Sequence, residues 1–316
     1  MIVDAHAHVF PRIRGFVAAG PTRGLKFGQI RVGKETVQLL PPFRERTVFT
    51  PDMLIAHMNW AGVDRAVLLQ GPFYGQCNRY VADAVNRYPD RLVGAACFDP
   101  WDVNARTTFE TEIRGQPFAA VKFECSMPAG LCGIHPGAQL GDPSLSWIWD
   151  QLERQGLALV LDLGAVGSAS YQTDAVRTIA QEHGDLKIVI AHLAQPNLIV
   201  EADAFLWRLW EQQIDLAQLP NVWFDTASLP AYVSKEAFPY PSVTRYLRLA
   251  VDRVGPEKIL WGTDVPSALT QATYPQLLEL AHVHTQFLST PERRMVLAEN
   301  SRKVFCPPHP AKTKYQ

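Results

Sequence analysis

Cysteine is scarce in this sequence and shows no paired spacing. The 316 residues contain five cysteines, at Cys77, Cys97, Cys125, Cys132 and Cys306. An odd number without a repeated spacing argues against a disulfide framework and fits a reducing cytoplasm. We interpret the five residues as ordinary thiols rather than as a metal or redox site.

Long apolar runs are also missing. No stretch reaches the roughly 18 apolar residues that a membrane-spanning helix needs, so no such helix is expected. Asp4 and His6 interrupt the start of the chain before an apolar segment of useful length, so no signal peptide is expected either. These features predict a chain that does not enter a membrane.

Neither sign of charge dominates. The 30 Lys and Arg residues face 31 Asp and Glu residues, which gives a net charge of −1 and excludes a globally basic nucleic-acid binder. Hydrophobic residues make up 47% of the chain and charged residues 19%, so the composition is that of a folded protein with a large core.

Short apolar runs alternate with helical patterns along the chain. The runs are nearly continuous, as in parallel strands that are covered on both faces. They cover residues 2–3, 65–70, 92–98, 118–124, 157–162, 187–192, 222–225 and 258–264. The helical patterns cover 51–62, 76–88, 103–115, 144–156, 171–183, 203–217, 240–254 and 273–285.

Eight strand–helix units predict an α/β fold of the (β/α)8 type, the TIM barrel. The alternative is a doubly wound sheet. That fold typically has a glycine-rich turn after the first strand, where this chain has histidines. We expect a single domain over 1–306 and a C-terminal tail over 307–316. Two long inserts, 11–50 and 125–142, follow the first and fourth strands and would lie at the carboxyl-end face, where barrels hold their active sites.

Histidines and carboxylates stand where several predicted strands end. His6 and His8 are two residues apart, so their side chains point to the same side of the first strand. His192 ends the sixth strand and Asp264 the eighth. Imidazole and carboxylate donors in one ring suit a divalent ion such as zinc or manganese. Taken singly, each residue has a plainer explanation as a buried polar group or a helix cap.

The chain resembles the amidohydrolase superfamily, and within it the amidohydrolase-related family 2. The resemblance runs over nearly the whole length and is most specific in the His-x-His of the first strand and the Gly-Thr-Asp of the last. It is carried by the segments 3–8, 61–67, 88–94, 190–193, 260–266 and 297–301. The family includes lactone hydrolases, non-oxidative decarboxylases and a hydratase.

The resemblance implies a barrel that holds one divalent metal ion, with zinc expected first and manganese as the alternative. It implies that His6, His8 and Asp264 are ligands and that His192 acts on the water or the substrate. For hydrolysis, we expect Asp264 also to accept the proton of the water. Many members carry a further histidine ligand on the fifth strand, where this chain has Asp162.

Two carboxylates are candidates to replace that missing histidine. We predict Glu124 as a further ligand or water-holding group, and Asp162 together with Lys122 in the surrounding shell, with Asp162 as the alternative ligand. Lactonases of the wider family also show Asp-Leu at this place, and a proline close behind the sixth-strand histidine, as in 192–196. Both features favour hydrolysis.

The insert 11–50 is locally basic, with eight Lys and Arg residues against two Glu residues. It is either an ordinary solvated segment or a lid that clamps an anionic substrate, since arginine binds a carboxylate through two parallel hydrogen bonds. The arginines are scattered among Gly, Pro and apolar residues, so a nucleic-acid interface is not expected. The candidates for substrate binding are Arg23, Arg31, Arg44 and Arg46.

Three functions remain open from the sequence. The first is metal-dependent hydrolysis of a small cyclic or aromatic carboxylate, a lactone, ester or amide. The second is metal-dependent, non-oxidative decarboxylation of an aromatic or muconate-type acid, and the third is a non-catalytic binding barrel. We expect a small anionic molecule as the partner. The stretch 205–210 is rich in aromatic residues and would suit either a homodimer contact or a helix packed on the barrel.

Overall fold

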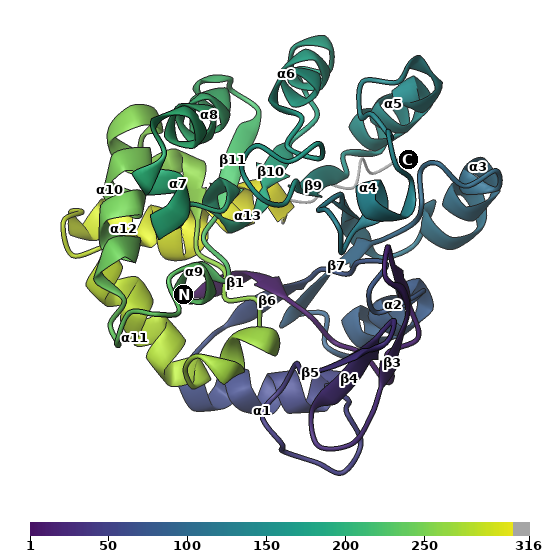
Figure 1. The fold of residues 1–316 in the computed structure, drawn as a ribbon, viewed down its shortest axis with the longest axis horizontal. Helices are drawn as coiled ribbons and strands as arrows, with labels where there is room; N and C mark the ends of the chain where they lie inside the picture. The colour runs from purple at the N-terminus through teal and green to yellow at the C-terminus, as the bar shows by residue number, and fades with distance from the viewer. Residues whose placement is uncertain (306–316) are drawn as a thin grey trace, which may run out of the picture.

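Eight parallel strands form the central sheet of the computed structural model, which describes residues 1–305 (Figure 1). Their order is β1-β6-β7-β8-β9-β10-β11-β12, and each corresponds to one of the eight predicted runs. The strands are β1 (Val3–Ala7), β6 (Arg65–Leu68), β7 (Leu92–Ala96), β8 (Phe118–Glu124), β9 (Ala158–Asp162), β10 (Ile188–Ile190), β11 (Val222–Asp225) and β12 (Ile259–Leu260). The predicted tail 307–316 lies outside the described residues.

The sheet closes on itself between its first and last strands. The amide of Ala5 donates to the carbonyl of Trp261 at 2.9 Å, and just beyond β12 the amide of Asp264 donates to the carbonyl of His6 at 2.8 Å. His8 continues the pairing with the carbonyl of Val265 at 2.7 Å. The closed sheet is the predicted (β/α)8 barrel.

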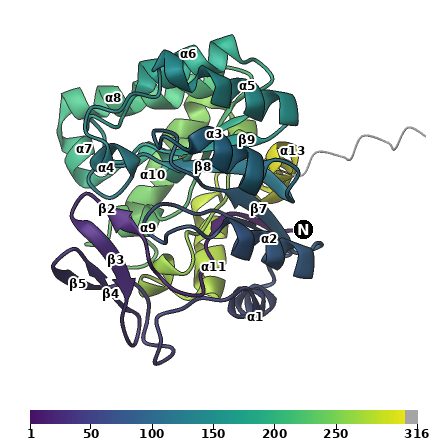
Figure 2. The same ribbon diagram turned by 90° about the vertical axis from the view of Figure 1, so that its right-hand side faces the viewer.

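Helices surround the barrel, as both ribbon views show (Figures 1 and 2). The main ones are α1 (Pro51–Ala61), α2 (Asn78–Arg87), α3 (Ala105–Thr108), α5 (Ser146–Gln155), α6 (Thr173–Glu182), α8 (Ala204–Ile214), α10 (Pro241–Val254) and α11 (Tyr274–His284). Short helices are α4 (Leu131–Ile134), α7 (Leu198–Ala202), α9 (Leu229–Tyr232), α12 (Thr290–Arg294) and α13 (Asn300–Phe305). Single 3-10 or π turns span Phe109–Ile113, Pro143–Leu145, Ala191–Ala194, Asp215–Gln218, Pro256–Lys258, Ser267–Thr270 and Met295–Glu299.

Local sequence fixes where helices begin and end. The Thr50 side chain accepts from the amide of Met53, Pro51 opens α1, and Gly62 ends it in a left-handed conformation that glycine adopts without strain. Helix α12 begins at Thr290, because Ser289 caps it in a reciprocal box with Glu292.

Two layers of apolar side chains hold the barrel together. One fills the barrel interior with residues such as Ala5, Val160 and Trp223, and Phe305 of α13 packs against it. The other lies between the strands and the surrounding helices and includes Trp210. Trp210 is buried while Phe205 on the same helix α8 is 68% exposed, so the stretch 205–210 packs on the barrel and its dimer contact stays a prediction.

The insert 11–50 holds a small antiparallel sheet, which the sequence analysis did not predict. Its strands are β2 (Phe16–Val17), β3 (Gly20–Gly24), β4 (Gln29–Val32) and β5 (Glu35–Gln38). The amide of Phe16 donates to the carbonyl of Pro72, and that of Ala18 to the carbonyl of Pro128. These carbonyls belong to loops after β6 and β8, so the sheet stands at the rim of the carboxyl-end mouth (Figure 2).

No helix within residues 1–305 is long and apolar enough to cross a membrane, in agreement with the sequence.

The seam of the barrel depends on a buried carboxylate, and this can be tested. The Asp4 side chain accepts hydrogen bonds from the amide and hydroxyl of Thr263 and from the hydroxyl of Tyr274, the last at 2.7 Å. We expect Tyr274→Phe to lower the free energy of unfolding by about 2 kcal/mol, because it removes a hydrogen bond to a charged group. Chemical denaturation measures this change.

The matched control is Tyr80→Phe, since the Tyr80 hydroxyl on α2 makes no hydrogen bond within residues 1–305. That variant should stay within about 0.5 kcal/mol of the parent. Equal stability of the two variants would contradict the role given to Asp4.

Candidate metal centre and active site

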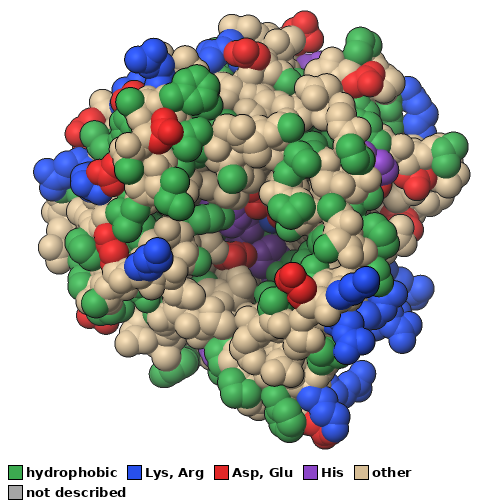
Figure 3. All heavy atoms as spheres, in the orientation of Figure 1, with side chains coloured by type: hydrophobic (Ala, Val, Ile, Leu, Met, Phe, Trp, Pro, Cys, Tyr) green, Lys and Arg blue, Asp and Glu red, His purple; other side chains and the backbone are tan. Residues whose placement is uncertain are grey.

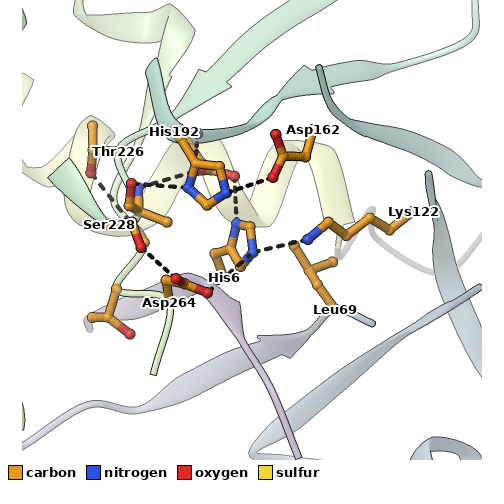
Figure 4. A network of polar contacts seen from close by, with 12 residues as sticks. His6, Leu69, Lys122, Asp162, His192, Thr226, Ser228 and Asp264 are labelled. Carbon is orange, nitrogen blue, oxygen red and sulfur yellow. Dashed lines mark hydrogen bonds and ion pairs between the residues drawn. The ribbon is translucent and has the colours of Figure 1, made fainter. Parts of the chain in front are cut away.

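The mouth of the barrel is hollowed, and histidine and carboxylate side chains lie at its bottom (Figure 3). Figure 4 shows His6 between Lys122 and Asp264, with His192 and Asp162 beside it. The residues come from the carboxyl ends of β1, β8, β9 and β10 and from the segment after β12. The barrel therefore brings together the strand ends that the sequence singled out.

His6, His8 and Asp264 converge on one point. Their ligand atoms lie within 4.8 Å of one another. The Oδ1 atom of Asp264 is 2.8 Å from Nε2 of His8 and 3.9 Å from Nε2 of His6. The arrangement is the one predicted for the three ligands of a divalent ion.

The hydrogen bonds of the two imidazoles indicate that a cation belongs between them. In His6, Nδ1 faces Oδ2 of Asp225 at 3.0 Å, and in His8, Nδ1 faces the carbonyl of Leu69 at 2.6 Å. Both partners are acceptors, so each Nδ1 carries a proton. Burial lowers the pKa of His6 to about 4 and also lowers that of His8, which leaves both rings neutral.

Each Nε2 atom then presents a lone pair to the common point, and the lone pair of His8 faces a carboxylate oxygen. Two lone pairs and a carboxylate oxygen repel one another unless a cation lies among them. Neutral imidazole and carboxylate are the donors that zinc accepts. The residues present therefore fit a divalent ion.

Asp264 is held in place by two hydroxyl groups. Ser228 and Ser267 donate to its Oδ2 atom, the latter at 2.7 Å, so that Oδ1 faces the histidines. Asp264 has a φ of 67°, a left-handed conformation that is uncommon outside glycine. Burial on its own would raise the pKa of Asp264, but the imidazoles of His8, His6 and His192 hold it below the ordinary value.

His192 carries a positive charge in this site. Its Nε2 atom faces Oδ2 of Asp162 and its Nδ1 atom the carbonyl of Ala227, both at 3.1 Å. The carboxylate of Asp162 favours a proton on both ring nitrogens. Burial would lower the pKa of His192, but the Asp162 carboxylate outweighs it and raises the pKa to about 10. Asp162 is thus the partner of His192, and its place in the surrounding shell or as the alternative ligand stays a prediction.

Asp225 was not identified from the sequence. It ends β11 and accepts from Nδ1 of His6 through Oδ2 and from the amide of His192 through Oδ1, at 3.0 and 2.9 Å. Its position at the end of a strand, like that of Asp162, is the sequence feature that would have found it. His6, His192 and Asp225 form a second group of close donors, but hydrogen bonds already account for their contacts.

Lys122 and Glu124 form a buried ion pair on β8. The Lys122 ammonium lies 3.1 Å from Oε2 of Glu124 and 3.4 Å from Nε2 of His6. Ser126 donates to the other carboxylate oxygen of Glu124 at 2.6 Å. Within residues 1–305 neither group of close donors includes Glu124, and its place as a further ligand remains a prediction.

The charges at the mouth do not balance without an added cation. Four carboxylates, Glu124, Asp162, Asp225 and Asp264, face two cations, Lys122 and His192. With His6 and His8 neutral, the negative charges exceed the positive ones by two when Glu124 is ionised and by one when it is protonated, since burial and Asp162 raise the pKa of Glu124 to about 7. Buried charges must be paired, so a doubly charged ion fits the geometry and, with Glu124 ionised, the charge as well.

Lys and Arg side chains gather over the small rim sheet (Figure 3). All four predicted arginines of the insert are exposed. Arg44 contacts Met53 of α1, and Arg31 pairs across strands with Arg23. Among the four, Arg23 lines a cavity of about 390 Å³ beside the mouth, together with Pro72 and Asp99.

The amidohydrolase family model matches residues 3–306. The chain belongs to the amidohydrolase family. It is therefore an enzyme, of the hydrolase type. It is also similar to the 4-sulfomuconolactone hydrolase of Hydrogenophaga intermedia, with 23% identity over 96% of this chain and 88% of that protein.

Solved structures share the fold at lower identity. A zinc-bound amidohydrolase from Burkholderia multivorans has a TM-score of 0.71 at 15% identity and covers 98% of this chain and 100% of its own. A probable 2-pyrone-4,6-dicarboxylic acid hydrolase from Acinetobacter baumannii, with citric acid bound, has a TM-score of 0.66 at 17% identity, covering 96% and 98%. A 5-carboxyvanillate decarboxylase from Sphingomonas paucimobilis has a TM-score of 0.54 at 15% identity, covering 79% and 81%.

The position of His6 depends on the glycine that faces it, which gives a test of the centre. A Cβ atom on Gly262 would lie 2.9 Å from Cβ of His6 and 3.2 Å from its amide nitrogen. We expect Gly262→Ala to displace His6 and to weaken zinc binding by about 10- to 100-fold, in the range found when a ligand's support is changed. Zinc titration, with thermal unfolding in parallel, measures the effect.

Gly184→Ala is the control, because an added Cβ atom there meets nothing within 4 Å. A folded Gly262→Ala protein that binds zinc as tightly as the parent would show that His6 is not a ligand.

Proposed function

We propose that this enzyme hydrolyses a lactone in a small anionic molecule, using a divalent ion held by His6, His8 and Asp264. The observation that carries the proposal is the convergence of two neutral imidazoles and a carboxylate opposite a positively charged imidazole. The similarity to a sulfomuconolactone hydrolase over 96% of the chain supports a lactone as the substrate. Zinc is the first choice of metal, and manganese the alternative.

Each site residue has its own role in hydrolysis. A divalent ion bound here would lower the pKa of a coordinated water and polarise the substrate carbonyl. Asp264 takes a proton from the attacking water, since its carboxylate is ionised and oriented by Ser228 and Ser267. His192 stabilises the oxygen that becomes negative, because Asp162 keeps the imidazole protonated. Asp225 positions both His6 and His192.

Arg23 supports an anionic substrate. Its Nη1 atom donates to the carbonyls of Thr22 and Gly15, which fixes the guanidinium at the cavity beside the mouth. A guanidinium held by main-chain contacts is preorganised to bind a carboxylate or sulfonate through its remaining donors. The substrate would then place its lactone at the metal centre and its anionic group on Arg23.

Metal removal and one substitution test the proposal. We expect the purified protein to open a carboxylated lactone, to lose this activity on chelation, and to recover it with zinc or manganese. Asp264→Asn should lower kcat by at least about 100-fold, since the proton acceptor is lost. The control is Asp174→Asn, which changes a fully exposed carboxylate. Product analysis by NMR decides the reaction.

The decarboxylase alternative predicts a different product from the same residues. It gives carbon dioxide and a shortened acid, whereas hydrolysis gives a ring-opened acid. Release of carbon dioxide from an aromatic or muconate-type acid, without lactone opening, would replace our proposal by this alternative. Absence of both reactions in the metal-loaded protein would favour a binding barrel.

The anion contact is tested separately with a conservative change. We expect Arg23→Lys to raise KM about tenfold with little effect on kcat, because lysine cannot donate two parallel hydrogen bonds to one carboxylate. Arg208→Lys, on the exposed side of α8, is the control. An unchanged KM in Arg23→Lys would place the anion elsewhere.

A further inference from the structure

A tyrosine at the mouth has a hydroxyl group that no part of the described chain uses. Tyr232 is the last residue of α9, and its ring lies edge-on to the ring of His192 with centroids 5.9 Å apart. The side chain is half-buried and packs against the apolar layer around the barrel. No hydrogen bond to its hydroxyl occurs within residues 1–305.

Of the buried tyrosines elsewhere in residues 1–305, four have a hydrogen-bonded hydroxyl group, and Tyr74, whose ring centroid lies 5.1 Å from that of His8, does not. The four hydroxyl groups that donate to a carbonyl or carboxylate are those of Tyr171, Tyr240, Tyr246 and Tyr274. A buried phenol usually finds such a partner. Tyr232 therefore keeps a donor free beside His192, as Tyr74 does beside His8.

The segment that carries Tyr232 also holds the groups around the metal centre. The carbonyl of Ala227 accepts from His192, and the hydroxyl of Ser228 donates to Asp264. Four residues later the chain reaches Tyr232. The short helix α9 thus fixes the position of the phenol relative to His192 and Asp264, the two groups that act on the carbonyl carbon.

The charges around Tyr232 keep its proton in place. Burial, followed by the carboxylates of Asp162 and Asp264, holds the pKa of Tyr232 well above its ordinary range. At neutral pH the group is a hydrogen-bond donor and not a phenolate. A neutral donor suits an oxygen that gains negative charge during the reaction.

We propose that Tyr232 is a catalytic residue that donates a hydrogen bond to the ring oxygen of the lactone as that oxygen leaves. The inference rests on the proposed function. During hydrolysis the carbonyl carbon is bonded to three oxygen atoms. The oxygen of the attacking water lies beside Asp264, the former carbonyl oxygen lies beside His192, and the third is the ring oxygen. The remaining donor next to His192 is the Tyr232 hydroxyl.

The step balances without an added reagent. The water oxygen forms a bond to the carbonyl carbon and loses a proton to Asp264. The bond between that carbon and the ring oxygen breaks, and its electron pair goes to the ring oxygen. Tyr232 stabilises this charge until the proton held by Asp264 neutralises it.

The test compares two lactones that differ in their leaving group. The ring oxygen of a saturated lactone leaves as an alkoxide, which needs a hydrogen-bond donor. The ring oxygen of an enol lactone leaves as a stabilised enolate. We expect Tyr232→Phe to lower kcat about 100-fold on the saturated lactone and only a few-fold on the enol lactone, in the range of one lost oxyanion donor. KM and bound zinc should stay within about twofold.

Tyr80→Phe is the matched control, since it removes a hydroxyl without a hydrogen bond on α2, outside the site. If the wild type is active and Tyr232→Phe loses kcat equally on both lactones, or not at all, the role of Tyr232 is overturned and the proposed function stands. A wild-type protein that opens neither lactone would overturn the proposed function and this inference with it.

Discussion

The pairing of β1 with the segment after β12 is the constraint on which the rest of the molecule depends. It closes the barrel, and the same hydrogen bonds set the candidate metal centre, because the amide of Asp264 donates to the carbonyl of His6. The buried Asp4 carboxylate joins the two sides through Thr263 and Tyr274. A chain that failed to close here would lose the fold and the ligand set together.

Charge at the mouth is organised around that seam. Burial keeps His6 and His8 neutral so that their lone pairs are available, while the carboxylate of Asp162 keeps His192 protonated. Identical side-chain chemistry thus yields two neutral rings and one cation within a few ångströms. The difference lies in the balance of two effects: burial dominates at His6 and His8, whereas the carboxylate of Asp162 outweighs burial at His192.

The sequence predicted the barrel well because its elements are local in origin. Continuous apolar runs specify buried strands, and their carboxyl ends share one face, which placed His6, His8, His192 and Asp264 together. The rim sheet in 11–50 was missed, since its strands are short and mostly exposed and carry little apolar pattern. Asp225 was missed for another reason: it acts through His6 and His192, and such a contact depends on the closed barrel.

Backbone conformation shows why local patterns could not place the remaining groups. Residues 192–195 are all left-handed, as are Ser228 and Asp264, and no glycine marks these turns. Such conformations cost about 1–3 kcal/mol at a typical residue and persist only where the surroundings impose them. Here the imposed turns aim His192 at Asp162 and Asp264 at the two histidines. The stability of the closed barrel is therefore what maintains the strained geometry of its mouth.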